Sequence, residues 1–157
     1  MDDKRALLRH TVATVAYRGG KAVRGAPASF ATFASGDPPK TPAQILAHIG
    51  DLYDWALSIA QGAQKWNNST PLPWDDEVAR FFGTVKRLDD YLSSDAPIDS
   101  TPERLFQGAI ADSLTHIGQL ALLRRLAGCP IKAENYYQAD IAAGRVGPDQ
   151  TAARREF

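Results

Sequence analysis

Apolar side chains recur at helical spacing in four stretches of the chain, and no stretch shows the alternation typical of a half-buried β-strand. In the first stretch, Leu8, Val12 and Val15 fall on one helical face. In the third, a single apolar stripe runs from Val78 to Leu92. Helices are therefore expected at about residues 3–24, 41–64, 75–92 and 101–128.

Capping residues mark the boundaries of these helices. Thr41 is followed by Pro42 and, three residues on, by Gln44, which together form a capping-box signature for the second helix. Gly128 and Pro130 end the fourth helix, because glycine readily adopts the left-handed conformation at a helix end and proline cannot continue a helix.

Four helices joined by polar loops predict an all-α fold, an up-down four-helix bundle. A chain of 157 residues fits a single domain over residues 1–157, with the bundle at about 3–128 and a tail at 129–157. The tail has no long periodic segment, and Asn135, Tyr136 and Tyr137 suggest an ordered but irregular C-terminal cap. The same tail could instead pack at a dimer interface.

Two polar residues interrupt the apolar stripe of the fourth helix. Asp112 and His116 stand one turn apart, so their Cβ atoms lie roughly 5–6 Å from each other, and the helical period puts both on the inward line. A buried carboxylate needs a partner, which either His116 or a cation would supply. The apolar members of that line are Leu105, Ala109, Leu120, Leu123 and Ala127.

His48 is a second histidine that the helical pattern turns inward, one turn from Ile45 and Leu52. Facing helices of a bundle lie about 8–10 Å apart, so side chains of two helices can reach one ion. His48, Asp112 and His116 are thus a candidate two-histidine, one-carboxylate site for Zn, Fe(II), Mn or Ni, with positions left for water or substrate. The competing interpretation is an intrahelical ion pair beside a histidine that bonds to backbone or water. Spacing alone does not decide between them.

Composition narrows the classes of function. Lys and Arg together number 18, as do Asp and Glu, so no net field attracts nucleic acid and no nucleic-acid partner is expected. The N-terminal sequence lacks the apolar core of a signal peptide, and no run reaches the roughly 20 apolar residues of a membrane span. We therefore expect a cytoplasmic protein without a membrane partner. Cys129 is the single cysteine and cannot form an internal disulfide.

Two stretches resemble the DinB/YfiT-like proteins, a superfamily of metal-binding four-helix bundles. Residues 45–55, ILAHIGDLYDW, are similar to the family's second-helix signature, where a histidine precedes Leu and Trp. Residues 112–120, DSLTHIGQL, followed by LRRLAG at 123–128, resemble its pattern H-x-x-x-H-R-G-Q with a Leu/Arg-rich turn and a terminal glycine. The resemblance covers the four expected helices in their order along the chain.

The resemblance implies a divalent metal held by His48, which matches the first ligand, and His116, which matches the third. Asp112 stands where the family has its second histidine, and Ile117 stands where it has arginine. Asp is a competent ligand, but its harder oxygen shifts preference away from thiolate-loving ions. Family members with known activity use the metal to activate a small thiol or water. A small-molecule thiol or electrophile as substrate, and a homodimer, are what this similarity implies.

Five further residues are candidates for the surroundings of the metal, each with a structural alternative. Gln119 and Ser113 flank the ligand line, although Gln119 could fix a helix contact and Ser113 could bond to its own backbone. Trp55 could wall a pocket, but a tryptophan at such a position is more often part of a core. Tyr136 and Tyr137 could close over the site and donate hydroxyl groups, or simply pack the tail down.

Three classes of function stay open. A metal-dependent enzyme of the S-transferase or hydrolase type is the one that the resemblance favours. A non-catalytic metal- or ligand-binding bundle is the second, and a structural dimer whose polar trio is only a buried network is the third. The chain contains no serine nucleophile elbow, phosphate loop or dinucleotide fingerprint that would indicate another chemistry.

Overall fold

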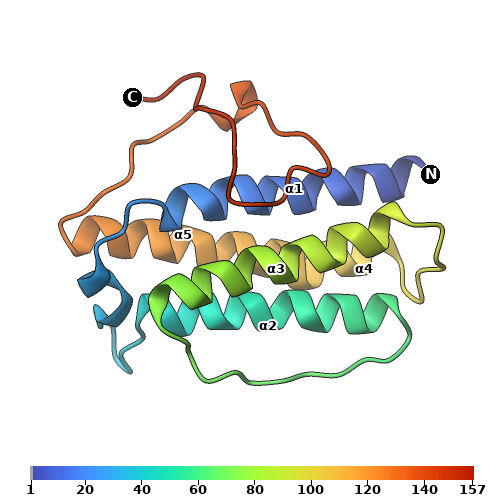
Figure 1. Cartoon of the computed structure of the whole chain (residues 1–157), viewed down its shortest axis with the longest axis horizontal. Coiled ribbons are helices and arrows are strands. Elements are labelled where there is room, and N and C mark those ends of the chain that lie inside the picture. The colour runs from blue at the N-terminus through green and yellow to red at the C-terminus, as the bar shows by residue number, and fades with distance from the viewer. Residues whose placement is uncertain (1) are drawn as a thin grey trace.

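The computed structural model describes residues 2–157, and within that range the chain is helical and contains no β-strand. The long helices pack side by side as a bundle, and the C-terminal tail lies over one of them (Figure 1). The all-α prediction is confirmed. The helices are α1 (Asp3–Val23), α2 (Pro42–Ala60), α3 (Trp74–Ser93), α4 (Pro102–Leu105) and α5 (Ala111–Leu126), with a π-helical turn at Phe106–Ile110 and 3-10 turns at Ala28–Thr32 and Tyr136–Gln138.

Local capping sets the ends of α2 and α5. The Thr41 hydroxyl accepts the Gln44 backbone N–H at 3.2 Å, and the Gln44 side chain accepts the Thr41 N–H at 2.9 Å, which confirms the predicted capping box. At the other end α2 stops earlier than expected, because Gly62 turns the chain with a φ of 71°. Gly128, with a φ of 76°, ends the last helix where the sequence predicted.

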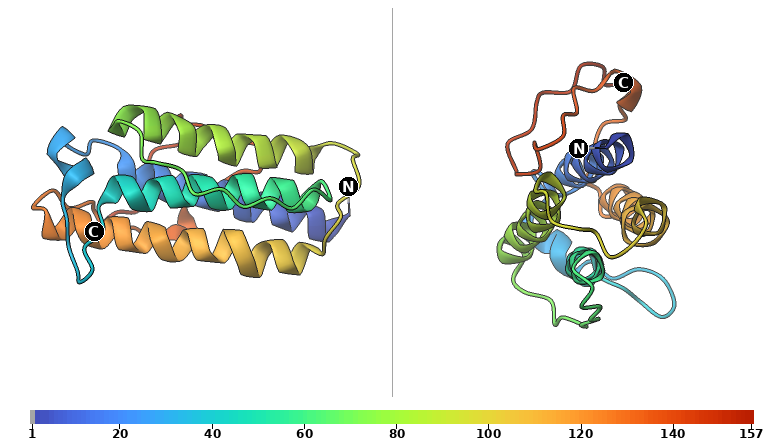
Figure 2. Two further views of the ribbon diagram at one scale, coloured as in Figure 1. Left: turned by 90° about the horizontal axis from the view of Figure 1, so that it is seen from below. Right: turned by 90° about the vertical axis from the view of Figure 1, so that its right-hand side faces the viewer.

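The helix directions correct the expected up-down succession. Arg80 of α3 bonds to the Ala47 carbonyl of α2, and Tyr91, farther along α3, bonds to the Ala60 carbonyl, so α2 and α3 run parallel. The chain between them returns along the whole bundle (Figures 1 and 2). Thirteen extended residues, 61–73, can span about 43–47 Å, whereas a helix the length of α2 spans only about 28 Å. Such a segment serves as a crossover, not as the short turn that an up-down bundle needs.

The π-helical turn at 106–110 also corrects the expected position of the acidic ligand candidate. A π turn holds one residue more than an α turn, so every later side chain is rotated by about one residue's angle, roughly 100°. Ser113, not Asp112, therefore continues the inward line, and Ser113 and Ile117 are buried. Asp112 and His116 lie at the edge of the helix, only partly buried, and not in the dry interior that uninterrupted helical counting predicted.

Arg124 joins the C-terminal ends of α1 and α5. Its guanidinium is buried and donates hydrogen bonds to the carbonyls of Ala22, Arg24 and Cys129 at 3.1, 3.0 and 2.6 Å. Carbonyls at a helix end have no partner within the helix, and a buried cation both satisfies them and opposes the helix dipole. The side chain is thus part of the architecture, as its place near the helix end suggests.

The tail, residues 129–157, is an irregular cap on α1, as the sequence suggests. Glu134 is its buried anchor and accepts the Tyr17 hydroxyl at 2.6 Å and the Lys21 ammonium at 2.7 Å. A β-bridge pairs Glu134 with Glu156, which also bonds to Lys21 at 2.9 Å. Within residues 2–157, none of the helices combines the length and apolar character needed to cross a membrane.

We expect Arg124→Met to lower the free energy of unfolding by about 2–4 kcal/mol, because three carbonyls lose a buried charged donor. Arg125→Met is the matched control: Arg125 is the exposed neighbour on the same helix, and its loss should change stability by no more than about 0.5 kcal/mol. Urea unfolding followed by circular dichroism measures both. Equal effects of the two substitutions would contradict the role given to Arg124.

Candidate metal centre

His48, Asp112 and His116 converge at the contact between α2 and α5. One Asp112 oxygen lies 3.5 Å from Nε2 of His116, and the other lies 3.8 Å from Nε2 of His48. One ligand atom from each of the three residues lies within 4.8 Å of the others. We refer to these residues as the trio. Among residues 2–157 they are the one group of three or more His, Cys, Asp or Glu side chains close enough to share an ion.

Helix geometry explains why these side chains meet. Asp112 and His116 are four residues apart on α5 and so share one side of it. His48 reaches them from α2, and its ring centroid lies 4.7 Å from that of His116, with the two rings nearly perpendicular. The Asp112 side chain is 47% exposed and that of His48 is 38% exposed, so the trio opens to solvent on one side.

Gln119 orients the His116 ring. Its Oε1 lies 2.7 Å from Nδ1 of His116, one turn farther along α5. With the proton on Nδ1, the ring donates to Gln119 and presents the Nε2 lone pair toward Asp112. Metal-binding histidines are commonly held in this way, by a second hydrogen bond from the nitrogen that does not bind the ion. The candidate role given to Gln119 from its position beside the ligand line agrees with this contact.

The surroundings of His48 favour its neutral ring. Burial lowers the pKa of His48 below its ordinary value of 6.5, and the neighbouring His116 lowers it further, while the Asp112 carboxylate opposes both effects. A neutral imidazole keeps the lone pair that a metal requires, so at neutral pH the ring is in the state that can bind an ion.

The donor set and its spacing fit a divalent cation. Ligands bound at about 2.0–2.2 Å on one ion lie about 3–3.5 Å from each other, close to the 3.5 and 3.8 Å between Asp112 and the two histidines. The ligand atoms of all three residues lie within 4.8 Å of one another, so small side-chain rotations would bring them onto one ion. Two imidazole nitrogens and a carboxylate oxygen suit Zn, Fe(II), Mn or Ni. Three protein donors also leave coordination positions free on the exposed side.

Trp66 is a residue of this site that the sequence analysis does not single out. Its ring packs edge-on against His48, at 5.7 Å between centroids, and against Trp55, at 5.9 Å. Trp66 belongs to the crossover between α2 and α3, and its own neighbours in sequence give no sign of this contact. Only knowledge that the crossover returns along α2 would have brought it to His48.

Buried charges hold this crossover against α2. The Asp51 carboxylate, one turn from His48, accepts both the backbone N–H and the hydroxyl of Ser69, at 2.9 and 2.6 Å. Arg80 of α3 pairs with Asp51 and, at 3.1 Å, with the fully buried Glu77. Because both acids share one cation and further hydrogen bonds, the cluster tolerates burial and fixes the segment that carries Trp66.

Three of the expected neighbours of the metal, Ser113, Tyr136 and Tyr137, are not part of the site. Ser113 is buried, and its hydroxyl donates to the Ala109 carbonyl at 2.6 Å. This is the bond to its own helix backbone that the sequence offers as the alternative to a role beside the metal. Tyr136 packs edge-on against Tyr17 of α1 and under the Arg18 guanidinium, and Tyr137 is 97% exposed. Neither tyrosine is therefore brought to the trio. The tail covers α1 (Figure 1), whereas the three residues of the trio belong to α2 and α5.

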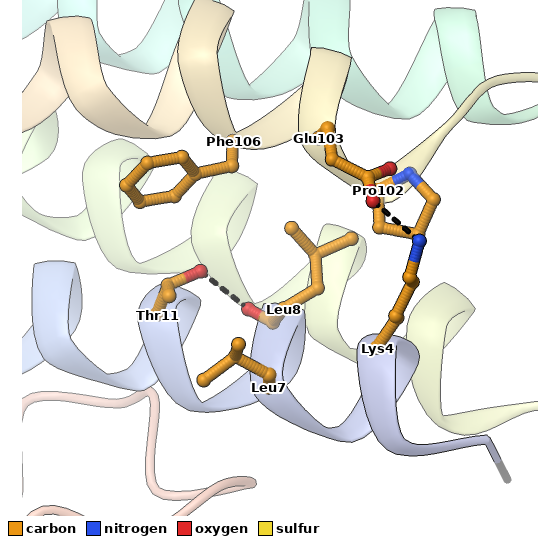
Figure 3. Close-up of a pocket in the computed structure, with 7 residues that line it drawn as sticks. All are labelled: Lys4, Leu7, Leu8, Thr11, Pro102, Glu103 and Phe106. Atoms are coloured by element: carbon orange, nitrogen blue, oxygen red, sulfur yellow. Dashed lines mark hydrogen bonds and ion pairs between the residues drawn. The ribbon is translucent and has the colours of Figure 1, made fainter.

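An open cavity of about 380 Å³ lies between α2, the π turn and α5, and its wall includes Trp55 and one member of the trio, Asp112. Trp55 thus takes the wall position considered for it, although it also packs partly against the core. A second, strongly apolar hollow of about 350 Å³ lies between α1 and α4, where Leu7, Leu8 and Phe106 surround it (Figure 3). It shares no lining residue with the trio, so it is not part of this site.

Comparisons with protein-family models, curated proteins and solved structures found no match to this chain. The similarity to the DinB/YfiT-like proteins therefore stays a hypothesis based on two short motifs. The convergence of His48, Asp112 and His116, by contrast, is a property of the fold.

In metal-free protein we expect His48 to titrate below 6.5, and Asp112→Asn to lower its pKa further by removing the carboxylate that raises it. As the pH falls, His48 is protonated in the unfolded chain before it is protonated in the folded protein. Its contribution to the free energy of unfolding is therefore fully present above pH 6.5 and is lost as the pH falls from 6.5 toward the pKa of the folded state. Imidazole NMR shifts followed against pH measure this. A His48 pKa at or above 6.5 would contradict the described environment.

Proposed function

We propose that the trio binds one divalent cation and that the loaded protein is an enzyme acting on a small thiol or water. The observation that carries this proposal is the convergence of three donors from two helices with one side open. A bound divalent ion lowers the pKa of a coordinated thiol or water and so supplies a nucleophile at neutral pH. The resemblance of residues 45–55 and 112–128 to the DinB/YfiT-like pattern points to the same chemistry.

Each residue of the site would have a separate role in binding the ion and the substrate. His48 and His116 would bind as neutral nitrogen donors, with Gln119 holding the His116 ring in the tautomer that leaves Nε2 free. Asp112 would offset part of the ionic charge. Trp55 and Trp66 would exclude water from one side and leave the cavity beside Asp112 as the approach for substrate.

Exposure argues against the interpretation of the trio as a buried structural network. Such a network stabilises or specifies a fold when its members are enclosed and fully bonded to one another. Here Asp112 is nearly half exposed, and its distances to both histidines exceed those of good hydrogen bonds. Long, solvent-exposed contacts of this kind are typical of side chains that a metal ion would draw together.

We expect about one divalent ion per chain in protein purified without a histidine tag or chelator. His48→Ala, Asp112→Ala and His116→Ala should each weaken binding at least about 100-fold, since losing even a residue that supports a ligand costs 10–100-fold. His10→Ala and Asp90→Ala are matched controls, because both residues are exposed and outside the trio. Elemental analysis measures the metal, and circular dichroism checks the fold.

Protein that carries no ion and gains no thermal stability from Zn, Ni, Mn or Fe(II) would rule out the proposal. Water-proton relaxation of Mn-loaded protein separates the enzyme from a non-catalytic metal protein. Rapidly exchanging water on the ion supports the enzyme, and a closed coordination sphere favours the alternative.

Gln119→Leu should weaken metal binding by about 10–100-fold without changing the fold, because His116 would lose the acceptor that selects its tautomer. Gln119→Glu keeps an acceptor at the same place and should retain most of the affinity. Competition with a chromogenic chelator measures both. An unchanged affinity in Gln119→Leu would show that the hydrogen bond has no part in binding.

A further inference from the structure

Two adjoining cavities lie between the trio and a polar region farther along α2. The cavity beside Asp112 shares Trp55, Gln107 and Gly108 with a second cavity, of about 600 Å³, that extends to Arg104. The two cavities meet at these three residues, and we refer to them together as the groove. The groove therefore starts at a proposed metal ligand and ends at a charged side chain of α4.

The π-helical turn shapes the middle of this groove. Gly108 lies inside the turn with a ψ of −105°, outside the helical range. A Cβ at this position would lie in ordinary contact with the Trp55 ring, at 3.9 Å, so a side chain longer than alanine would occupy the space beside that ring. π turns inside α-helices occur often at functional sites. Here the turn and the missing side chain together keep the groove open.

Arg104 is the single cation among the residues that line either cavity. It is exposed, and within residues 2–157 no carboxylate lies in salt-bridge range of its guanidinium. The planar guanidinium can bind a carboxylate through two parallel hydrogen bonds. Asp99 lines the same end of the groove, and its negative charge disfavours a doubly charged phosphate more than a singly charged carboxylate.

We propose that this groove binds the tail of the substrate, and that the substrate is an elongated molecule with its reacting end at the trio and a carboxylate at Arg104. The proposal rests on the proposed function for the position of the reacting end. Gln64, Ser100 and Gln107 add amide and hydroxyl groups along the wall, so the tail between the two ends is polar or only partly apolar. Trp55 lies between the two cavities and would contact the middle of the ligand.

The probes are linear ω-mercaptocarboxylates of increasing length, each compared with the ω-mercaptoalcohol of the same length. Isothermal titration calorimetry is run on Zn-loaded and on metal-free protein. At the best length we expect the acid to bind about tenfold more tightly than the alcohol, the scale of a charged hydrogen-bonded pair. Arg104→Ala should remove this preference and leave the alcohol unchanged. Arg104→Lys should keep part of it, and Arg125→Ala, another exposed arginine, should keep all of it.

Gln64→Trp tests the course of the groove, because Gln64 lines the cavity that extends to Arg104 and is not part of the trio. It should weaken the long acids by about tenfold while leaving metal content and the shortest thiol unaffected. Gln61→Trp is the matched control, because Gln61 is an exposed glutamine nearby that lies outside both cavities. Equal loss in the two variants would contradict the proposed path.

The two proposals fail in different ways. Equal binding of acid and alcohol at every length, or a preference untouched by Arg104→Ala, overturns the groove while the metal centre stands. If no ion binds, the proposed function fails, and the metal-free titration still decides the groove. An Arg104-dependent preference for the acid then supports it as a carboxylate site, and its absence overturns it.

Discussion

One extra residue in the turn at 106–110 decides which side chains of the last helix enter the core and which meet α2. With an uninterrupted α-helix, Asp112 would point into an apolar interior, where its charge would be costly. The turn moves Ser113 inward, where its hydroxyl is satisfied by the Ala109 carbonyl. Asp112 is left at the edge, beside His48 and next to a cavity. The same backbone irregularity thus removes an energetic problem and creates the open side of the trio.

The sequence predicts the local features of this protein well. The capping box at Thr41 and Gln44 depends on residues three apart, and the stop at Gly128 depends on one backbone angle, so both are visible without the fold. His48 and His116 also lie together, as the sequence predicts, but the predicted reason is wrong: helical counting put His116 in the interior, whereas it lies at the edge of α5 beside α2. The prediction from helical periodicity fails across residues 106–110, because no residue type there indicates a π turn.

Long-range partners explain the remaining differences. Glu77 looks like an acid favoured by the first turn of a helix, yet it is fully buried and accepts the Leu72 N–H as well as the Arg80 guanidinium. Asp51 has the position of an ordinary polar residue of α2 in the sequence, yet its carboxylate accepts two hydrogen bonds from Ser69 of the crossover. These roles follow from the parallel arrangement of α2 and α3, which the spacing of apolar residues does not reveal. The same arrangement brings Trp66 over His48.

The attachment of the tail to α1 has a consequence for how this part of the protein comes apart. The backbones of Glu134 and Glu156 form a β-bridge and both carboxylates bond to Lys21, so the two ends of the intervening segment are held together on α1. Val146, in the middle of this segment, is buried in the core. The carboxylate of Glu134 is fully buried and stays so only while Tyr17 and Lys21 serve it. Breaking any one of these contacts leaves a buried charge without its hydrogen-bond partner. Residues 134–156 should therefore detach from α1 in one concerted step, a small cooperative unit on a bundle that remains folded beneath it.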